Sequence, residues 1–291
     1  MFVREIGGRR FVPLHLLPTA AWLSLWNEDI RERLLATEPE ALFQHGDPAG
    51  LDVIVRRRAL EVYLERYKGQ KRQFDHFDPG ALRRFAPALE DAVMANLKRQ
   101  DLPHEAIAFL LQLAVEGGLT SCSSYGVFWA ANIGADSRLR REAFRAVAAL
   151  ASKQEKRRLA DQLLRDPGEW EQNVVGVFAS HFFPSVLSAA ELGTLLRRVA
   201  PGSPRTHTHI KTFVWHELPV ICPAADRLTM LRELAETLRQ TTRDQGWLVH
   251  GLQELSRTVI EAVSPDEEPP DELKDSLLLL MSVDELPLTA R

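Results

Sequence analysis

The chain has 291 residues, of which 45% are apolar and 26% are charged, values typical of a folded globular protein. Its 36 basic and 40 acidic residues leave a formal charge of −4, and this balance argues against a dedicated nucleic-acid binder, which usually carries a basic excess. The two cysteines, Cys122 and Cys222, form neither a CxxC pair nor a disulfide framework and indicate reduced thiols in a cytoplasmic protein.

The first apolar segment, Phe11–Trp26, follows two arginines and has the composition of a signal peptide. Two prolines and a histidine interrupt it, and no A-x-A-like cleavage site follows, so we expect a cytoplasmic helix instead. No stretch of the sequence reaches the ~18–20 continuous apolar residues that span a bilayer. Because Trp22 and Trp26 are unlike the polar face of a capping repeat, the segment is either a helix docked on its neighbours or an edge covered by further chain.

Helical periodicity dominates the rest of the chain. Residues 54–67 place apolar side chains near i, i+3, i+4 and i+7 and charged side chains on the other face, which predicts an amphipathic helix. The same pattern predicts helices over residues 78–97, 102–116, 123–132, 137–151, 154–165, 170–182, 188–199, 206–218, 223–239, 245–263 and 271–281. Strand-like alternation is rare, and a short hairpin of Phe2-Val3 with Arg10–Val12 is the one exception that we expect.

Local signals mark several helix ends. Asp78 followed by Pro79 is typical of an N-cap and a first helical residue. Ser188 with Glu191 matches a capping box, and Gly117-Gly118 is suited to close the helix that begins near Leu102.

Three short segments share an apolar residue followed four places later by alanine and a large apolar residue. The alanines are Ala59, Ala106 and Ala143, which are 47 and 37 residues apart. This spacing is close to the ~40–47-residue period of HEAT repeats. We therefore predict an all-α protein, an α-solenoid of HEAT-like antiparallel helix pairs over residues 1–263. An acidic, proline-containing linker and a terminal helix follow over residues 264–291.

The common catalytic and cofactor motifs are missing from the sequence. It has no GxxxxGK[ST] loop, no GxGxxG, no GxSxG and no HExxH. We therefore expect no enzyme activity and no cofactor, and assign no catalytic, cofactor-binding or metal-binding residue.

Two sets of reactive residues are weaker candidates for metal binding or catalysis. His207, His209 and His216 could ligate a metal, but the set is incomplete and residues two apart do not share a helix face. Cys122 could act as a nucleophile with His181 or His250 as base, although its small-residue surroundings favour an inert thiol.

Basic clusters and large aromatic residues suggest where a partner could bind. The clusters are Arg56–Arg58, Lys68–Arg72, Arg138–Arg141, Lys153–Arg158 and Arg197–Arg198. Acidic residues interleave with most of them, so nucleic-acid binding remains the alternative rather than the preferred function. The aromatic residues Tyr125, Trp129, Trp170 and Trp215 are possible interface anchors, although residues at helical spacing more often belong to the core.

Several phrases resemble a known family when taken in order. They are Ala21–Leu23, Asp29–Leu34, Glu38–Glu40, Gly46–Pro48, Arg57–Leu60, Glu65–Tyr67, Gly118–Thr120, Leu139–Ala143, Phe183-Pro184 and Leu187–Leu192. Over roughly Gly8 to Val199 the chain resembles the helical-repeat region behind the NTPase module of large bacterial NACHT/STAND-type ATPases.

The resemblance implies a function in antiphage defence. In such proteins the repeat array is a sensor that recognises an invader-derived molecule, often a phage protein, and releases a nucleotide switch. This sequence contains no Walker motif and no effector, so the resemblance implies the sensor or scaffold part alone, and no catalytic residue is carried over. The partner is then a protein, either an upstream NTPase domain or a phage protein.

Overall fold

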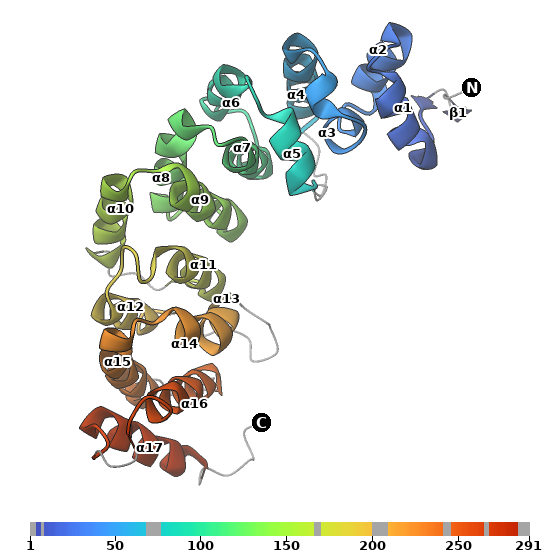
Figure 1. The fold of residues 1–291 in the computed structure, drawn as a ribbon. Coiled ribbons are helices and arrows are strands. Elements are labelled where there is room, and N and C mark those ends of the chain that lie inside the picture. The colour runs from blue at the N-terminus through green and yellow to red at the C-terminus, as the bar shows by residue number, and fades with distance from the viewer. Residues whose placement is uncertain are drawn as a thin grey trace. The chain divides into compact units, whose positions relative to one another are not determined.

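The computed structural model describes residues 4–6, 9–67, 77–165, 170–199, 209–240, 246–264 and 268–284 (Figure 1). These residues are predominantly helical, which confirms the predicted all-α class. The chain divides into two compact units, Met1–Ala151 and Ser152–Arg291, called unit 1 and unit 2. The predicted boundary between residues 263 and 264 stays a prediction.

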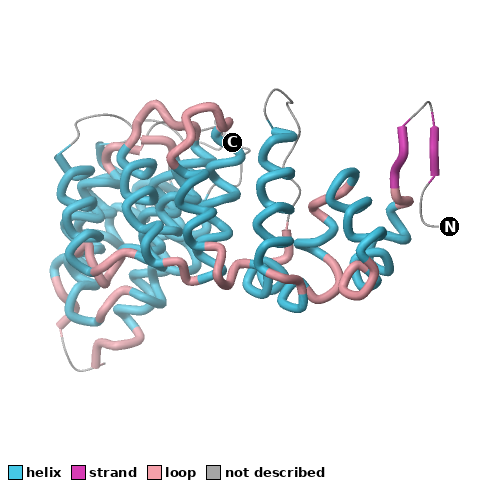
Figure 2. Tube along the Cα trace, turned by 90° about the horizontal axis from the view of Figure 1, so that it is seen from above, coloured by secondary structure: helices cyan, strands magenta, loops and turns pink. Residues whose placement is uncertain are grey.

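A short antiparallel hairpin precedes the first helix (Figure 2). Strand β1 (Arg4–Ile6) pairs with β2 (Arg9–Phe11), with Arg4 opposite Phe11. The hairpin was predicted, but its first strand begins after the expected Phe2-Val3, which lie outside the described residues.

Unit 1 contains helices of very different lengths. They are α1 (Leu17–Leu23), α2 (Glu28–Thr37), α3 (Ala41–Gln44), α4 (Val53–Tyr67), α5 (Pro79–Phe85), α6 (Glu90–Leu97), α7 (His104–Gly117), α8 (Ser123–Ala131) and α9 (Ser137–Leu150). The helices α1, α3, α5, α7 and α9 form one row in which each packs on the next. Helix α2 packs on α4, and α8 packs along α9.

The helix predicted over residues 78–97 is in fact two helices. Helix α5 begins as expected, because the Asp78 side chain accepts a hydrogen bond of 2.7 Å from the backbone N–H of Ala81 and Pro79 follows it. It ends at Phe85, and α6 starts only at Glu90. Between them Pro87 has no N–H to continue the helix, and Ala88 adopts a positive φ of 63°.

Aromatic rings form the centre of the core of unit 1. Phe43 of α3 lies 4.5 Å from Phe85 of α5, measured between ring centroids, and Tyr63 of α4 lies 5.2 Å from Phe109 of α7. Phe77 lies 5.0 Å from Phe109, so five rings from four helices and a loop meet at one point. All five are at most 2% exposed. Offset and edge-on rings at these distances bring large apolar areas out of water.

The helices of unit 2 form two rows. Its helices are α10 (Lys153–Arg165), α11 (Gln172–Phe182), α12 (Ala189–Leu196), α13 (His209–Thr212), α14 (Leu218–Ile221), α15 (Arg227–Gln240), α16 (Gly246–Ile260) and α17 (Asp271–Asp284). One row is formed by α10, α12, α15 and α17. The other is formed by α11, then α13 with α14 and the π-helical turn Phe213–Glu217 between them, and then α16. The terminal helix α17 therefore packs within unit 2, on α15 and α16.

Two glycines bring helices of unit 2 into close contact. A Cβ atom at Gly176 of α11 would lie 2.3 Å from the backbone nitrogen of Ile210, and a Cβ atom at Gly251 of α16 would lie 2.2 Å from Cγ1 of Val214. Any larger residue at these positions would push the helices apart. The helix–helix distance in unit 2 thus depends on the absence of two side chains.

The alanine spacing does not mark a single repeat. Ala106 on α7 and Ala143 on α9 do occupy adjacent helices of one row, 37 residues apart. Ala59 lies on α4, which packs on α2 and is not part of that row, so the 47-residue spacing joins unlike positions. All three alanines are fully buried. A small buried residue recurs on helices inside and outside this row, because each of these helices must approach a neighbour closely.

Candidate functional site

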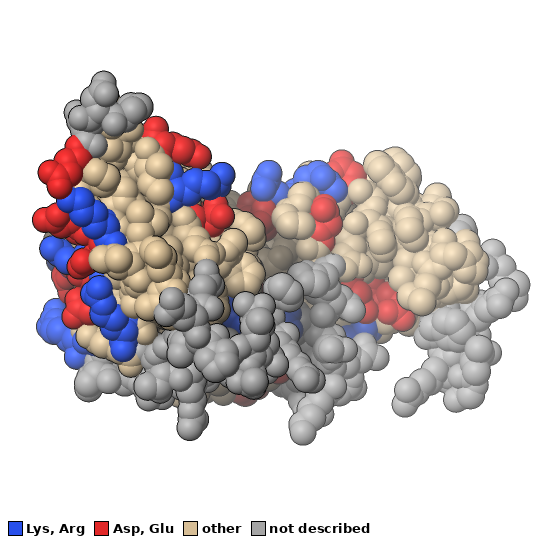
Figure 3. Space-filling model, turned by 90° about the horizontal axis from the view of Figure 1, so that it is seen from below, with Lys and Arg blue, Asp and Glu red and all other residues tan. Residues whose placement is uncertain are grey.

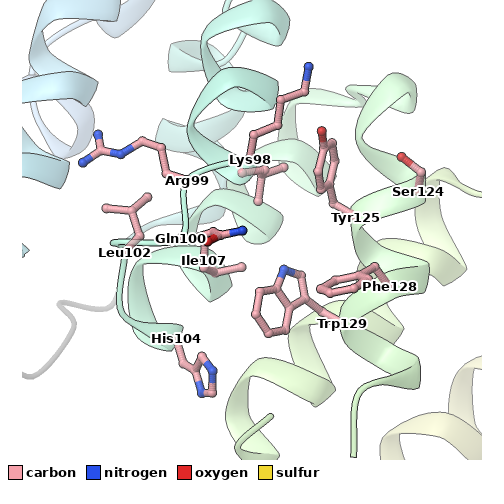
Figure 4. Close-up of a pocket in the computed structure, with 11 residues that line it drawn as sticks. Lys98, Arg99, Gln100, Leu102, His104, Ile107, Ser124, Tyr125, Phe128 and Trp129 are labelled. Carbon is pink, nitrogen blue, oxygen red and sulfur yellow. The ribbon is translucent and has the colours of Figure 1, made fainter. Parts of the chain in front are cut away.

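A pocket of about 630 Å³ opens in unit 1 where the segment between α6 and α7 faces α8 (Figure 4). We call it the aromatic pocket. It is lined by Leu97, Lys98, Arg99, Gln100, Leu102, His104, Ile107, Ser124, Tyr125, Phe128 and Trp129. Its volume lies in the range of pockets that bind small molecules or one or two large side chains of a partner.

Helix α8 supplies the aromatic wall. Tyr125, Phe128 and Trp129 follow the i, i+3, i+4 spacing of one helix face. The opposite face carries small residues: Gly126 lies against α9, where an added Cβ would be 3.2 Å from the Cβ of Ala146. The contact with α9 therefore turns the aromatic face outward, and Phe128 is 60% exposed.

Arg99 holds the other wall in place. Its guanidinium donates to Asp101 at 3.0 Å and to Asn96 at 3.0 Å, and it forms an ion pair with Glu65 of α4 at 2.9 Å. These contacts, first of all the hydrogen bond to Asp101, raise the pKa of Arg99 above its ordinary value. Arg99 is thus a permanent cation whose charge two carboxylates already neutralise.

Trp129 is fixed between two other rings. Its indole lies 5.1 Å from Phe128 and 5.5 Å from His104, both in edge-on geometry. A hydrogen bond of 2.9 Å joins Nδ1 of His104 to Oδ2 of Asp136, the N-cap of α9. The indole is therefore oriented by three elements of the unit before any ligand arrives, which lowers the entropy that binding must offset.

Several polar side chains of the pocket can donate a hydrogen bond to a ligand. The side chains of Lys98, Tyr125 and Trp129 make no hydrogen bond or ion pair with the described part of the chain, whereas those of Arg99 and His104 are already paired. No aspartate or glutamate lines the cavity. The pocket therefore combines an apolar surface with a local excess of positive charge.

The structure separates the four aromatic residues nominated from the sequence. Tyr125 and Trp129 meet in the pocket, together with Phe128 and Lys98, which were not nominated. Trp170 is 3% exposed and lies in the core of unit 2, 6.2 Å from Phe178.

Trp215 has a mainly structural contact in unit 2. Its indole N–H donates to the backbone oxygen of Trp247 at 2.9 Å, and its ring lies 5.1 Å from His250.

Phe128 was missed in the sequence although a signal for it was present. The i, i+3, i+4 spacing of Tyr125, Phe128 and Trp129 on α8 could have added it to the nominated residues. It predicts a shared face without saying whether that face is buried.

Of the three histidines considered for a metal site, His209 and His216 belong to no metal-binding group among the described residues. His207 lies outside the described residues. His209 opens α13, where its backbone N–H donates to Asn173 at 3.1 Å, and His216 lies in the π-helical turn beside Trp215. No group of three or more His, Cys, Asp or Glu side chains in the described ranges could hold a metal ion.

Cys122 has the surroundings of an inert thiol. It is fully buried in unit 1, and burial raises its pKa to about 11, so the reactive thiolate is scarce at neutral pH. Its proposed bases, His181 and His250, belong to unit 2. Burial likewise raises the pKa of Cys222 to about 11.

Several arginines of the basic clusters have structural partners. Arg56 is buried and donates to the backbone oxygens of Phe85 and Pro87, each at 2.7 Å, and Arg198 donates to that of Leu164 at 2.7 Å. The cluster Lys68–Arg72 lies outside the described residues. On the face seen in Figure 3, basic and acidic side chains are interspersed. These arginines stabilise helix ends and loops and are not available to phosphates.

Comparison with family models, with curated proteins and with solved structures finds no match to this chain. Within the described ranges, no helix is both long and apolar enough to cross a membrane.

Proposed function

We propose that the chain is a non-catalytic helical-repeat interaction module that binds a segment of a protein partner in the aromatic pocket of unit 1. The observation that carries this proposal is the outward-facing aromatic surface of α8 beside a cation with no partner in the described chain. Large exposed apolar side chains next to a cavity are a feature of protein-binding surfaces, where tryptophan, tyrosine and arginine supply most of the affinity.

Recurring polar contacts support an α-solenoid of HEAT-like antiparallel helix pairs within each unit. Side chains repeatedly reach a partner 29 to 36 residues away. The pairs are Glu90 with Ser121, His104 with Asp136, Arg157 with Val186 and Arg197 with Glu233. Each of these contacts joins a residue to the equivalent region one helix pair further along the chain. The spacing is shorter than the ~40–47 residues of HEAT repeats. The proposed repeats are therefore short ones.

The geometry of the pocket supports binding rather than catalysis. His104 with Asp136 has the contacts of an acid–base pair, but a nucleophile must also lie within hydrogen-bond reach of the histidine. In Figure 4 the hydroxyl-bearing Ser124 lies at the opposite end of the pocket from His104. His104 instead orients Trp129, which is the role of a positioning residue.

The resemblance noted in the sequence extends the proposal to a biological setting. The chain would be the ligand-sensing or scaffold part of a cytoplasmic bacterial NACHT/STAND-type NTPase in antiphage defence. Its partner would be an upstream NTPase domain or a phage protein. This extension rests on the sequence phrases alone, and the pocket is the site at which it can be tested.

Panning a library of random displayed peptides against the full chain tests the binding function. We expect enriched peptides with a large apolar residue, whose affinity falls at least about tenfold in Trp129→Ala and in Phe128→Ala, as for removal of an interface anchor. Fluorescence polarisation of the labelled synthetic peptides measures these affinities.

Ile54→Ala is the matched control, because Ile54 is 73% exposed on α4 of the same unit and does not line the pocket. Phe128→Ala should leave the fold intact because this side chain is mostly in solvent, so a loss of binding in this variant cannot be due to unfolding. Enriched peptides that bind both pocket variants as tightly as the native chain would show the proposal to be wrong, and so would the absence of any enriched peptide.

A further inference from the structure

The charge of the aromatic pocket is concentrated on one residue. Three acidic residues that contact its walls are already used: Glu65 and Asp101 pair with Arg99, and Asp136 is bonded to His104. Lys98, in contrast, is exposed and makes no ion pair with the described residues. A ligand that enters the pocket therefore meets one ammonium group that no described side chain pairs with.

Lys98 is placed to act together with the aromatic wall. It is the C-cap of α6, and its backbone N–H donates to the oxygen of Met94, so its position is set by the helix. In Figure 4 the Lys98 side chain extends alongside the Tyr125 ring, and both polar tips lie on the same side of the pocket, beyond Trp129 and Phe128. An apolar floor thus borders an ammonium group and a phenolic hydroxyl.

This arrangement favours a carboxylate over a phosphate. Phosphorylated segments are usually bound by clusters of arginines, and duplex nucleic acid is held by many cations along a stripe. Here the single arginine of the lining, Arg99, is neutralised by Glu65 and Asp101. The remaining cation is the compact ammonium group of Lys98. One ammonium and one hydroxyl match the two oxygens of a single carboxylate.

We infer that the bound segment is acidic: a large apolar side chain packs on Trp129 and Phe128, and a neighbouring Asp or Glu binds Lys98 and Tyr125. This inference rests on the proposed peptide-binding function and assigns its specificity. Lys98 is the specificity-determining residue, because an exposed charge pair adds modest affinity but strongly disfavours a like charge.

The sequences of the enriched peptides give the first test. We expect Asp or Glu within a few positions of the apolar residue. Replacing that acid by Asn or Gln should weaken binding to the native chain about fivefold, the effect of one exposed charge pair. The same replacement should have no effect on binding to Lys98→Gln. Panning against Lys98→Glu should enrich Lys or Arg in place of the acid.

The control is Arg57→Gln, because Arg57 is an exposed cation of α4 that does not line the pocket. This variant should retain both affinity and the preference for acid. Peptides that require Trp129 but show no acidic preference, with Lys98→Gln binding as the native chain does, would overturn this inference and leave the binding function intact. The absence of any peptide dependent on Trp129 would overturn both.

Discussion

One helix interface in unit 1 and two in unit 2 close in opposite ways. In unit 1, Phe43, Phe85 and Phe109 fill a wide space between helices with rings. In unit 2, Gly176 and Gly251 let the helices touch through their backbones and small side chains. The interface in unit 1 should therefore be damaged most by removing atoms, and those in unit 2 by adding them. Single substitutions in each unit test that difference.

Phe43→Ala should have the largest effect on stability. The side chain is fully buried at the centre of the ring cluster, and its loss leaves a cavity that α3 alone cannot fill. We expect a loss of about 3–5 kcal/mol in the free energy of unfolding, measured with guanidinium chloride, and faster hydrogen exchange in α3, α5 and α7. The exposed Phe128→Ala is the control, and equal losses for the two variants would contradict the expected role of the rings.

Gly176→Ala should destabilise unit 2 although it removes nothing. The new methyl group would meet the backbone of His209 and Ile210, which cannot rotate away as a side chain can. We expect a loss of about 1–3 kcal/mol in the free energy of unfolding. Gly246→Ala is the control, because no atom lies within 4 Å of its added Cβ and alanine favours helix over glycine by up to about 1 kcal/mol. A neutral Gly176→Ala would mean that the helices can separate at no cost.

An ion pair in unit 2 should make stability depend on pH. Glu191 accepts from Arg157 at 2.6 Å and caps α12 with Ser188, and these bonds, that from Arg157 first, lower its pKa from 4.5 to about 2. A lowered pKa in the folded state means that its stabilisation is fully present above about pH 4.5 and is lost as the pH falls towards 2.

Glu191→Gln should therefore lower the free energy of unfolding at neutral pH by about 1 kcal/mol, a figure that allows for screening of this partly exposed pair. Thermal unfolding of both proteins across this pH range measures the difference, which should disappear at the acid end. A constant difference at every pH would show that Glu191 acts through its shape and not through its charge.

The smallest expected effect is on the rate of cysteine labelling, and because each unit contains one cysteine, this rate reports on each unit separately. Cys122 of unit 1 and Cys222 of unit 2 are buried with raised pKa values, so iodoacetamide should modify both far more slowly than a free cysteine. Mass spectrometry of pulse-labelled protein should show faster labelling of Cys122 in Phe43→Ala and of Cys222 in Gly176→Ala. Rapid labelling of either thiol in the native chain would contradict its burial.

Local chemistry in the sequence predicted many helix ends. The capping box of Ser188 and Glu191 and the N-cap at Asp78 are confirmed because each needs only residues three positions apart. The helix end predicted at Gly117-Gly118 is confirmed as well, because α7 ends at Gly117 and Gly118 adopts the left-handed conformation that glycine tolerates. The break at Pro87 was equally local but was missed, because the apolar periodicity continues across it.

The sequence by itself determined the helical class, most helix ends and the absence of familiar catalytic motifs. Tertiary structure alone decided which apolar side chains form a site. Phe109 and Phe128 both lie at helical spacing among apolar neighbours, yet one is 2% exposed and the other 60%. Helical periodicity fixes only which residues share a face. Whether another helix covers that face depends on contacts between residues far apart in the chain, as when α9 packs on the small side of α8 and leaves its aromatic side open.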